Sequence, residues 1–310
     1  MKPILFSLDT GILGKINFPS YFSMVAIGFI ISIWLGKREA IKLNIDPKKI
    51  IDLGIFMIIF GVLGARLLHV IADGQLWNYI YWCIDPEKVA WHVTEIECRH
   101  HKGIWDSINQ VCKPSNPHRD CLLWLKFWHG GLAFYGGFIL ATIFAIWYIR
   151  REKLPIGKIS DMAAWAVPLG LSWGRLGCFL NGCCFGKPTD SILGVKFPKW
   201  SIPYYTHLEK GWVTLYDKTS LKVHPTQLYE SIACFFIFVF IYFFLRKRKR
   251  FNGELFLVSS VMYACARFII EFVRDDARGN VGVLSTSQFI GIIVIIICII
   301  VWFRITKEEG

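Results

Sequence analysis

The sequence predicts an all-α polytopic membrane protein with seven transmembrane helices, its N-terminus outside the cell and its C-terminus in the cytoplasm. Of its 310 residues, 54% are hydrophobic, whereas soluble domains are usually about 45–50% apolar. The apolar residues gather in runs of roughly 17–23 residues, the length at which a helix crosses a bilayer. Basic residues follow alternate runs, as expected when every second loop faces the cytoplasm.

Seven apolar segments are expected to form the transmembrane helices. They cover residues 21–36, 50–71, 127–149, 159–176, 228–245, 255–273 and 284–303. Lys and Arg follow the first, third, fifth and seventh segments, most densely as RKRKR at 246–250. These ends are therefore placed in the cytoplasm, and the two long polar stretches outside. The basic residues of the cytoplasmic loops account for the formal net charge of +12. The sequence has no basic groove with interleaved aromatic residues, so we do not predict nucleic-acid binding.

We expect one integral-membrane domain, 1–310, with two extracytoplasmic regions. The first is a Cys-rich insert, 72–126, which holds Cys83, Cys98, Cys112 and Cys121. Cysteines in an oxidising compartment pair, so two disulfides are predicted, and the sequence leaves all three pairings open. The histidines of the insert follow no zinc-ligand spacing, and we predict no metal site. The second region is a signature loop and head region, 177–223.

The sixth segment carries a stripe of charge. Arg267, Glu271 and Arg274 are spaced by three and four residues, with Tyr263 one turn earlier, which places them on one helix face. One alternative is internal pairing that only holds helices together. However, one Glu cannot neutralise two Arg, and Arg175 in the fourth segment adds another positive charge. We favour a site for an anionic head group, because Arg binds phosphate oxygens bidentately.

Glycine and proline mark two further stretches. In WHGGLAFYGGFIL the pairs Gly130–Gly131 and Gly136–Gly137 bracket Tyr135. Small residues allow either close helix contact or a lipid lying against the backbone. In HPTQLYE, Pro225 suits a helix start, and Glu230 is positioned to hold one of the arginines or a ligand hydroxyl.

Four motifs together resemble the prolipoprotein diacylglyceryl transferase family: GRLGCFLNGCCFG, HGGLAFYGG, HPTQLYE and YACARFIIEFVR. The resemblance extends from about Tyr21 to the end of the chain, excluding the Cys-rich insert. It implies a bacterial inner-membrane enzyme that moves the diacylglyceryl group of phosphatidylglycerol to the lipobox cysteine thiol of a prolipoprotein. The products are a thioether and glycerol phosphate. The implied partners are phosphatidylglycerol, the prolipoprotein signal peptide and membrane lipids, with no cofactor.

The resemblance also implies roles for individual residues. Arg175 and Arg267 match the two essential arginines, and Tyr135 stands where the family has its histidine base. The residues that would bind phosphatidylglycerol are Arg175, Arg66, Tyr21, Gly130, Gly131, Glu230 and Tyr263. His129 is kept as an alternative base. If the helix were continuous, the separation of six residues from His129 to Tyr135 would turn the two side chains about 120° apart, so we favour Tyr135.

The chain departs from the family pattern at two cysteines. Cys178 stands where the family has Asn, and Cys183 where it has Glu. We expect neither these two nor Cys184 to be a nucleophile, and any disulfide among them to involve Cys178. The departures keep open a diverged lipid-head-group transferase. A non-enzymatic phospholipid-binding or transport protein is the other alternative, since it could use the same phosphate site.

Overall fold

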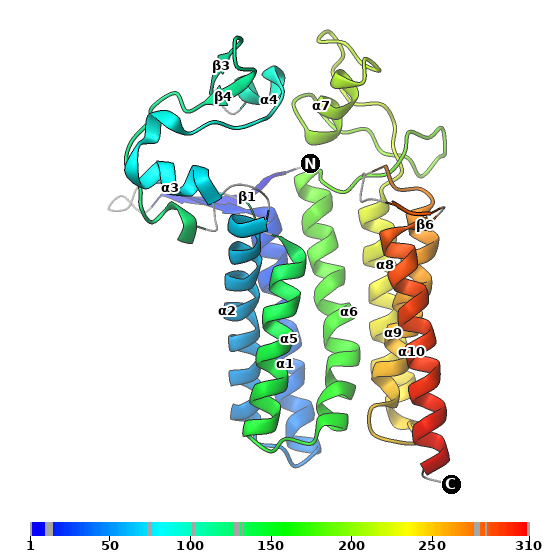
Figure 1. Ribbon diagram of the computed structural model, residues 1–310. Helices are drawn as coiled ribbons and strands as arrows, with labels where there is room; N and C mark the ends of the chain where they lie inside the picture. Colours follow the sequence, from blue (N-terminus) through cyan, green and yellow to red (C-terminus); the bar gives the residue numbers. More distant parts are fainter. Residues whose placement is uncertain are drawn as a thin grey trace. The chain divides into compact units, whose positions relative to one another are not determined.

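The computed structural model describes residues 2–9, 15–72, 76–100, 103–126, 131, 133–275, 280–282 and 284–308 (Figure 1). The chain is mostly helical and divides into two compact units. The first unit comprises Met1–Ile51 and Leu154–Gly310, and the second comprises Asp52–Lys153.

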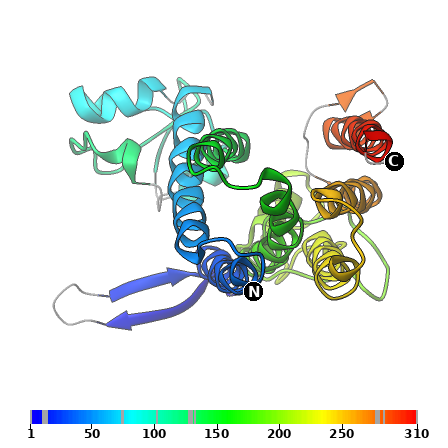
Figure 2. The same cartoon turned by 90° about the horizontal axis from the view of Figure 1, so that it is seen from below.

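The first unit is a helical bundle with short strands at one end. Its helices are α1 (Ser20–Lys42), α6 (Ile156–Asn181), α7 (Ile202–Glu209), α8 (Thr226–Val239), η4 (Phe240–Phe244, a π-helical turn), η5 (Leu245–Lys247), α9 (Glu254–Glu271) and α10 (Thr286–Glu308). Its described residues also form two antiparallel strand pairs, β1 (Ile4–Asp9) with β2 (Lys15–Pro19), and β5 (Asn280–Val281) with β6 (Leu284–Ser285). Figure 2 shows the first pair projecting sideways from α1.

Helix α6 is the centre of this bundle. It packs against α1, α8 and α9, and α9 packs in turn against α8 and α10. Small residues bring α1 and α6 together: a Cβ atom on Gly177 would lie 3.0 Å from the Cα of Tyr21, and one on Gly28 would lie 3.0 Å from the Cβ of Trp173. This close approach fixes the position of α6, the helix that carries Arg175.

The basic run after α8 joins three helices at one end of the first unit. Arg246 pairs with the buried Glu39 of α1. The ammonium group of Lys249 lies 2.8 Å from Asp161 of α6, and the other oxygen of Asp161 accepts the N–H of Leu255 at 3.0 Å. The run therefore has a structural function beside its predicted role in topology.

The opposite end of the first unit holds the connection from α6 to α8, which contains α7 (Figure 1). A small core of Phe185, Phe197 and Val223 packs this connection. The N–H of Val223 also donates to Val195, and the N–H of Val195 to Val223. The signature loop is thus a folded cap with its own core.

The second unit contains most of α2 (Pro47–Ala72), the Cys-rich insert and α5 (Phe134–Arg151). The insert is built from α3 (Leu76–Ile84), η1 (Pro86–Lys88), α4 (Glu95–His100), β3 (Ile104–Asp106), β4 (Val111–Lys113) and η2 (Leu123–Leu125). Helices α2 and α5 meet at glycines. A Cβ atom on Gly64 or Gly136 would overlap the carbonyl oxygen of the other residue, and one on Gly137 would lie 2.7 Å from the oxygen of Gly61. At Gly136 and Gly137, therefore, the small residues serve helix contact.

Two predicted helix ends near the candidate site residues differ from the structure by five residues or more. The third segment was expected to begin at residue 127, but α5 begins at Phe134, because Gly131 has φ +71° and Ala133 is extended. The fourth was expected to end at residue 176, but α6 continues to Asn181. It ends where Gly182 adopts φ +82°, since a left-handed glycine stops a helix and a charge such as Arg175 does not.

The protein is a membrane protein with at least four helices suited to crossing a bilayer. Within the described residues, these are Ser20–Lys42, Pro47–Ala72, Thr226–Lys247 and Thr286–Lys307. Their apolar faces are largely exposed in the isolated chain, only 6% of the most apolar stretch of α10 being buried. A lipid environment accounts for that exposure.

Two disulfides close the Cys-rich insert. Cys83 is bonded to Cys121, and Cys98 to Cys112. The second bond joins α4 to β4 and is fully buried, with Cys98 at 0% and Cys112 at 2% exposure. Both cross-links stabilise the folded insert by restricting its unfolded chain.

The glycine contact between α2 and α5 predicts the effect of single methyl groups. Gly136→Ala should destabilise the protein by about 1–3 kcal/mol, because the methyl group overlaps a backbone oxygen. Gly61→Ala is the matched control, since its methyl group meets nothing within 4 Å, and it should be neutral or slightly stabilising. The thermal unfolding midpoints of the purified variants test this. Equal midpoints for the two would contradict the described packing.

The disulfide pairing predicts the cross-linked peptides. After alkylation and proteolysis without reductant, mass spectrometry should find Cys83 linked to Cys121 and Cys98 linked to Cys112. Cys265, a free and exposed cysteine, should be alkylated in the same sample and so report that labelling worked. Alkylation of all four insert cysteines would refute both bonds.

Candidate functional site

Glu230 is the centre of a buried charged cluster in the first unit. It lies in the second turn of α8, which begins directly after Pro225, and is 1% exposed. Its Oε1 atom lies 3.0 Å from Nη2 of Arg175 on α6 and accepts a 3.0 Å hydrogen bond from the hydroxyl of Tyr263 on α9. Its Oε2 atom lies 3.6 Å from Nη1 of Arg274, just after α9. One carboxylate thus ties together three separate parts of the chain.

Arg267 forms the second part of the cluster. It follows Tyr263 by one turn of α9, and its Nη2 atom lies 2.6 Å from Oε2 of Glu271. The same nitrogen donates to the hydroxyl of Ser287 at 3.4 Å. Its Nη1 atom is buried and has no hydrogen-bond partner in the described part of the chain. A buried guanidinium nitrogen with unused donors is suited to an oxygen of a bound ligand.

The cluster carries an excess of positive charge. Its described members are three guanidinium groups, those of Arg175, Arg267 and Arg274, and the two carboxylates of Glu230 and Glu271. The Arg175 side chain is 17% exposed and that of Arg274 only 2%, so Arg175 is the more accessible. Surplus buried arginine favours an anion, and a phosphate oxygen pair matches its planar fork.

The signature loop is anchored beside this cluster by the start of α8. The hydroxyl of Thr226 donates to the carbonyl of Cys184, and the side-chain amide of Gln227 donates to the carbonyl of Cys183, both at 2.7 Å. A Cβ atom on Gly186 would overlap the carbonyl oxygen of Val273. The loop is therefore held against both α8 and the end of α9.

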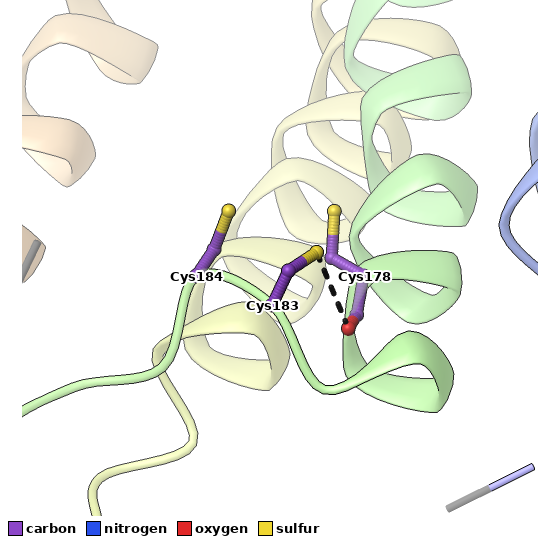
Figure 3. Close-up of side chains that lie close together, drawn as sticks. All are labelled: Cys178, Cys183 and Cys184. Carbon is purple, nitrogen blue, oxygen red and sulfur yellow. Dashed lines mark hydrogen bonds between the residues drawn. The ribbon is translucent and has the colours of Figure 1, made fainter. Parts of the chain in front are cut away.

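Three free thiols lie together where α6 ends, those of Cys178, Cys183 and Cys184 (Figure 3). The thiol of Cys183 donates to the carbonyl of Cys178 at 3.7 Å. Hydrogen bonds from Cys178 and Cys183 lower the pKa of Cys184, and the charges of Arg175 and Arg274 act in the same direction. The two cysteines that depart from the family pattern thus form one group with Cys184 beside the arginines.

Tyr21 also belongs to the first unit. It lies in the first turn of α1, where its backbone contacts Gly177 of α6. Its side chain is 37% exposed. The family resemblance assigns Tyr21 to the same site as Arg175. Gly177, which contacts Tyr21, lies two residues after Arg175 on α6.

Arg66 belongs to the second unit and binds backbone carbonyls. Its guanidinium group donates to Trp124 at 2.8 Å, Leu123 at 2.9 Å and Gly131 at 3.0 Å. Its charge also lies 5.0 Å from the ring centre of Tyr79. Arg66 therefore fixes the end of the Cys-rich insert to α2.

One candidate base, Tyr135, lies at the start of α5. Tyr135 is in the first turn of that helix and is 57% exposed. His129 and Gly130 lie outside the described residues. The rotation argument that separated Tyr135 from His129 assumed a helix through both residues, and it fails because α5 begins only at Phe134. Only the family resemblance still favours Tyr135 over His129.

Comparison with known proteins agrees with the four motifs. The family model of prolipoprotein diacylglyceryl transferase matches residues 9–304. The chain belongs to this family. Phosphatidylglycerol–prolipoprotein diacylglyceryl transferase of Clostridium tetani is 31% identical over 302 residues, covering 97% of both chains. Phosphatidylglycerol–prolipoprotein diacylglyceryl transferase 2 of Clostridium perfringens is 28% identical over 94% of this chain and 92% of its own. The enzyme of the same name from Geobacillus kaustophilus is 27% identical over 96% of this chain and 92% of its own.

Sequence reasoning missed several polar partners in this member of the family. Thr226 and Gln227 were quoted within HPTQLYE, but their bonds to the signature loop were not foreseen. The signal that could have indicated these bonds is the presence of two polar residues at the start of an apolar helix. Ser287 had no such signal, because a serine in the first turn of a helix is common.

The central position of Glu230 predicts the effect of neutralising it. Glu230→Gln should destabilise the protein by about 3–5 kcal/mol, the usual cost of leaving a buried charge unpaired. Tyr263→Phe is the comparison and should cost about 1 kcal/mol, since it removes one hydrogen bond. Thermal unfolding of both purified variants measures the difference. A Glu230→Gln variant as stable as Tyr263→Phe would show that the cluster does not depend on this carboxylate.

Proposed function

We propose that this protein transfers the diacylglyceryl group of phosphatidylglycerol to the lipobox cysteine thiol of prolipoproteins, the first step of bacterial lipoprotein maturation. One observation carries the proposal: residues of three family motifs, distant in sequence, meet at Glu230. They are Arg175 of GRLGCFLNGCCFG, Glu230 of HPTQLYE and Tyr263 of YACARFIIEFVR. The names of the relatives agree with this activity.

The proposed reaction alkylates sulfur. The substrate thiolate attacks the glycerol carbon that bears the phosphate ester, the new C–S bond forms, and the C–O bond breaks with its electron pair remaining on the phosphate oxygen. A base removes the thiol proton, because only the thiolate is a good nucleophile. The products are a thioether and glycerol phosphate.

The arginines would stabilise the departing phosphate. Arg175 and Arg267 bind the head group, and charge grows on the phosphate as the C–O bond breaks, so their attraction strengthens in the transition state. Glu230 holds Arg175 in place, and the free Nη1 of Arg267 is available to a phosphate oxygen. We assign the remaining contacts with phosphatidylglycerol to Arg66, Tyr21, Gly130, Gly131, Glu230 and Tyr263.

The proposed topology has seven spans in the bacterial inner membrane. Helices α5, α6 and α9 would cross beside the four strongly apolar ones, with the N-terminus outside and the C-terminus in the cytoplasm. Parity then places the Cys-rich insert (72–126) and the signature loop (177–223) on the outer side. The two disulfides of the insert suit an oxidising compartment.

One reconstituted assay tests the function. Purified protein is mixed with phosphatidylglycerol and a lipobox peptide, and the peptide is followed by mass spectrometry. A diacylglyceryl adduct on the cysteine, with glycerol phosphate released, is the expected result. Lipid binding without any adduct would support the phospholipid-binding or transport alternative. An adduct formed only with another donor lipid would support the diverged transferase.

The phosphate role of Arg175 predicts a sharp effect of a conservative change. Arg175→Lys should lower the rate in this assay roughly 10- to 100-fold, because a point charge cannot replace a planar fork. Arg250→Lys, an exposed arginine before α9, is the matched control and should be unaffected. Normal turnover by Arg175→Lys at normal protein levels would contradict the proposal that Arg175 binds the phosphate.

The base is assigned to Tyr135, with His129 as the alternative. Tyr135→Phe should abolish most turnover between about pH 6 and 9, and His129→Gln should not. Tyr135→His should be tolerated, since it restores the side chain of the family. Unchanged rates in Tyr135→Phe together with a collapse in His129→Gln would reverse the assignment.

A further inference from the structure

The three thiols at the end of α6 are arranged like the ligands of a metal ion. The sulfur atoms of Cys178, Cys183 and Cys184 all lie within 4.8 Å of one another. Figure 3 shows the last turn of α6 and the following turn presenting them to the same space. Three thiolates bound to one zinc ion at 2.3 Å stand about 3.8 Å apart, so side-chain adjustments of about 1 Å or less would complete the site.

The backbone fixes this arrangement before any ligand binds. The N–H of Gly182 donates to Phe179 and the N–H of Cys183 to Cys178, both at 3.2 Å. These two bonds around a left-handed glycine define a Schellman motif, in which a residue of the last helical turn contacts the second residue beyond the helix. Here those residues are Cys178 and Cys183. Cys184 follows with φ +60°, an unusual value for a residue other than glycine.

Side chains of α8 support the same turn from outside. Thr226 and Gln227 hold the carbonyl groups of Cys184 and Cys183. These bonds use backbone oxygens and leave the three sulfur atoms available. The thiols are therefore presented from a fixed backbone, as metal ligands require.

Two arginines lie near the three thiols. Arg175 lies one turn before Cys178 on α6, and Arg274 belongs to the same charged cluster. Three bare thiolates would compete with a phosphate for these arginines. A divalent cation would cancel most of that negative charge, so that Arg175 remains available to an anionic ligand.

We propose that Cys178, Cys183 and Cys184 bind one thiophilic d10 cation, with Zn²⁺ as the first candidate. Soft thiolate ligands select this class of ion. The ion would fasten the signature loop to the end of α6 and so hold the helix turn that carries Arg175. The inference depends on the described side chains and not on the proposed reaction, in which the ion takes no part.

A spectroscopic titration of the full-length protein tests the site. The protein is purified in detergent under anaerobic conditions and titrated with Co²⁺, then with Zn²⁺. We expect a thiolate-to-cobalt charge-transfer band that saturates at one ion per chain and is displaced by zinc. Cys178→Ser and Cys184→Ala should each weaken the band strongly, and Cys265→Ser on α9 should leave it unchanged. A wild-type protein without the band would overturn the proposal.

A second measurement needs no variant that could fail to fold. Alkylation of each free cysteine in the wild-type protein is timed with and without Zn²⁺ and mapped by mass spectrometry. Zinc should slow modification of the three thiols by about tenfold or more, because a metal-bound thiolate is a poor nucleophile. Cys265 should react at the same rate in both samples. Equal rates at Cys178, Cys183 and Cys184, or a disulfide between any two of them in the anaerobic sample, would refute the site.

Discussion

A carboxylate buried inside a membrane protein needs partners, and Glu230 has them on three parts of the chain. Removing an ion from water costs several kcal/mol, which only close opposite charges and hydrogen bonds offset. Arg175, Tyr263 and Arg274 supply these from α6, α9 and the segment after α9. The positions of those elements in the first unit are therefore coupled through one side chain.

The same constraint explains why the cluster keeps an excess of positive charge. If every guanidinium group had its own carboxylate, the site would be stable but neutral. If Glu230 were absent, three arginines would repel one another in a medium of low dielectric constant. Two carboxylates against three arginines keep the cluster assembled and leave a donor of Arg267 for a ligand. We infer that this balance is what the head group of phosphatidylglycerol requires.

Much of this arrangement could be predicted from sequence, and the remainder has physical causes. Hydropathy located the long helices, because apolar length is a direct property of the sequence. The spacing of Tyr263, Arg267 and Glu271 placed them on one face. The start of α5 could not be read, since a left-handed Gly131 looks like any helical glycine until its φ is known. The hydrogen bonds from Arg66 to three backbone carbonyl oxygens could not be predicted either. Every residue has a backbone carbonyl, so the side-chain pattern does not indicate which ones an arginine will bind.

The contact among the three cysteines is another feature that could not be predicted from the sequence. In the sequence, Cys178 and Cys183 were two departures from the family pattern, and any disulfide among these two and Cys184 was expected to involve Cys178. The helix-ending motif at Gly182 brings them into contact with each other and with Cys184. That contact depends on where α6 ends, and the predicted end was five residues too early.

The measurement that tests the central claim most directly is lipid retention by the purified protein, read by native mass spectrometry. The claim is that surplus guanidinium charge around Glu230 binds the phosphate of the donor lipid. The wild-type protein should retain phosphatidylglycerol in preference to diacylglycerol, and Arg267→Gln should lose that preference. Arg250→Gln, which changes an exposed arginine just before the start of α9, should keep it. An undiminished preference for phosphatidylglycerol in Arg267→Gln would contradict the account.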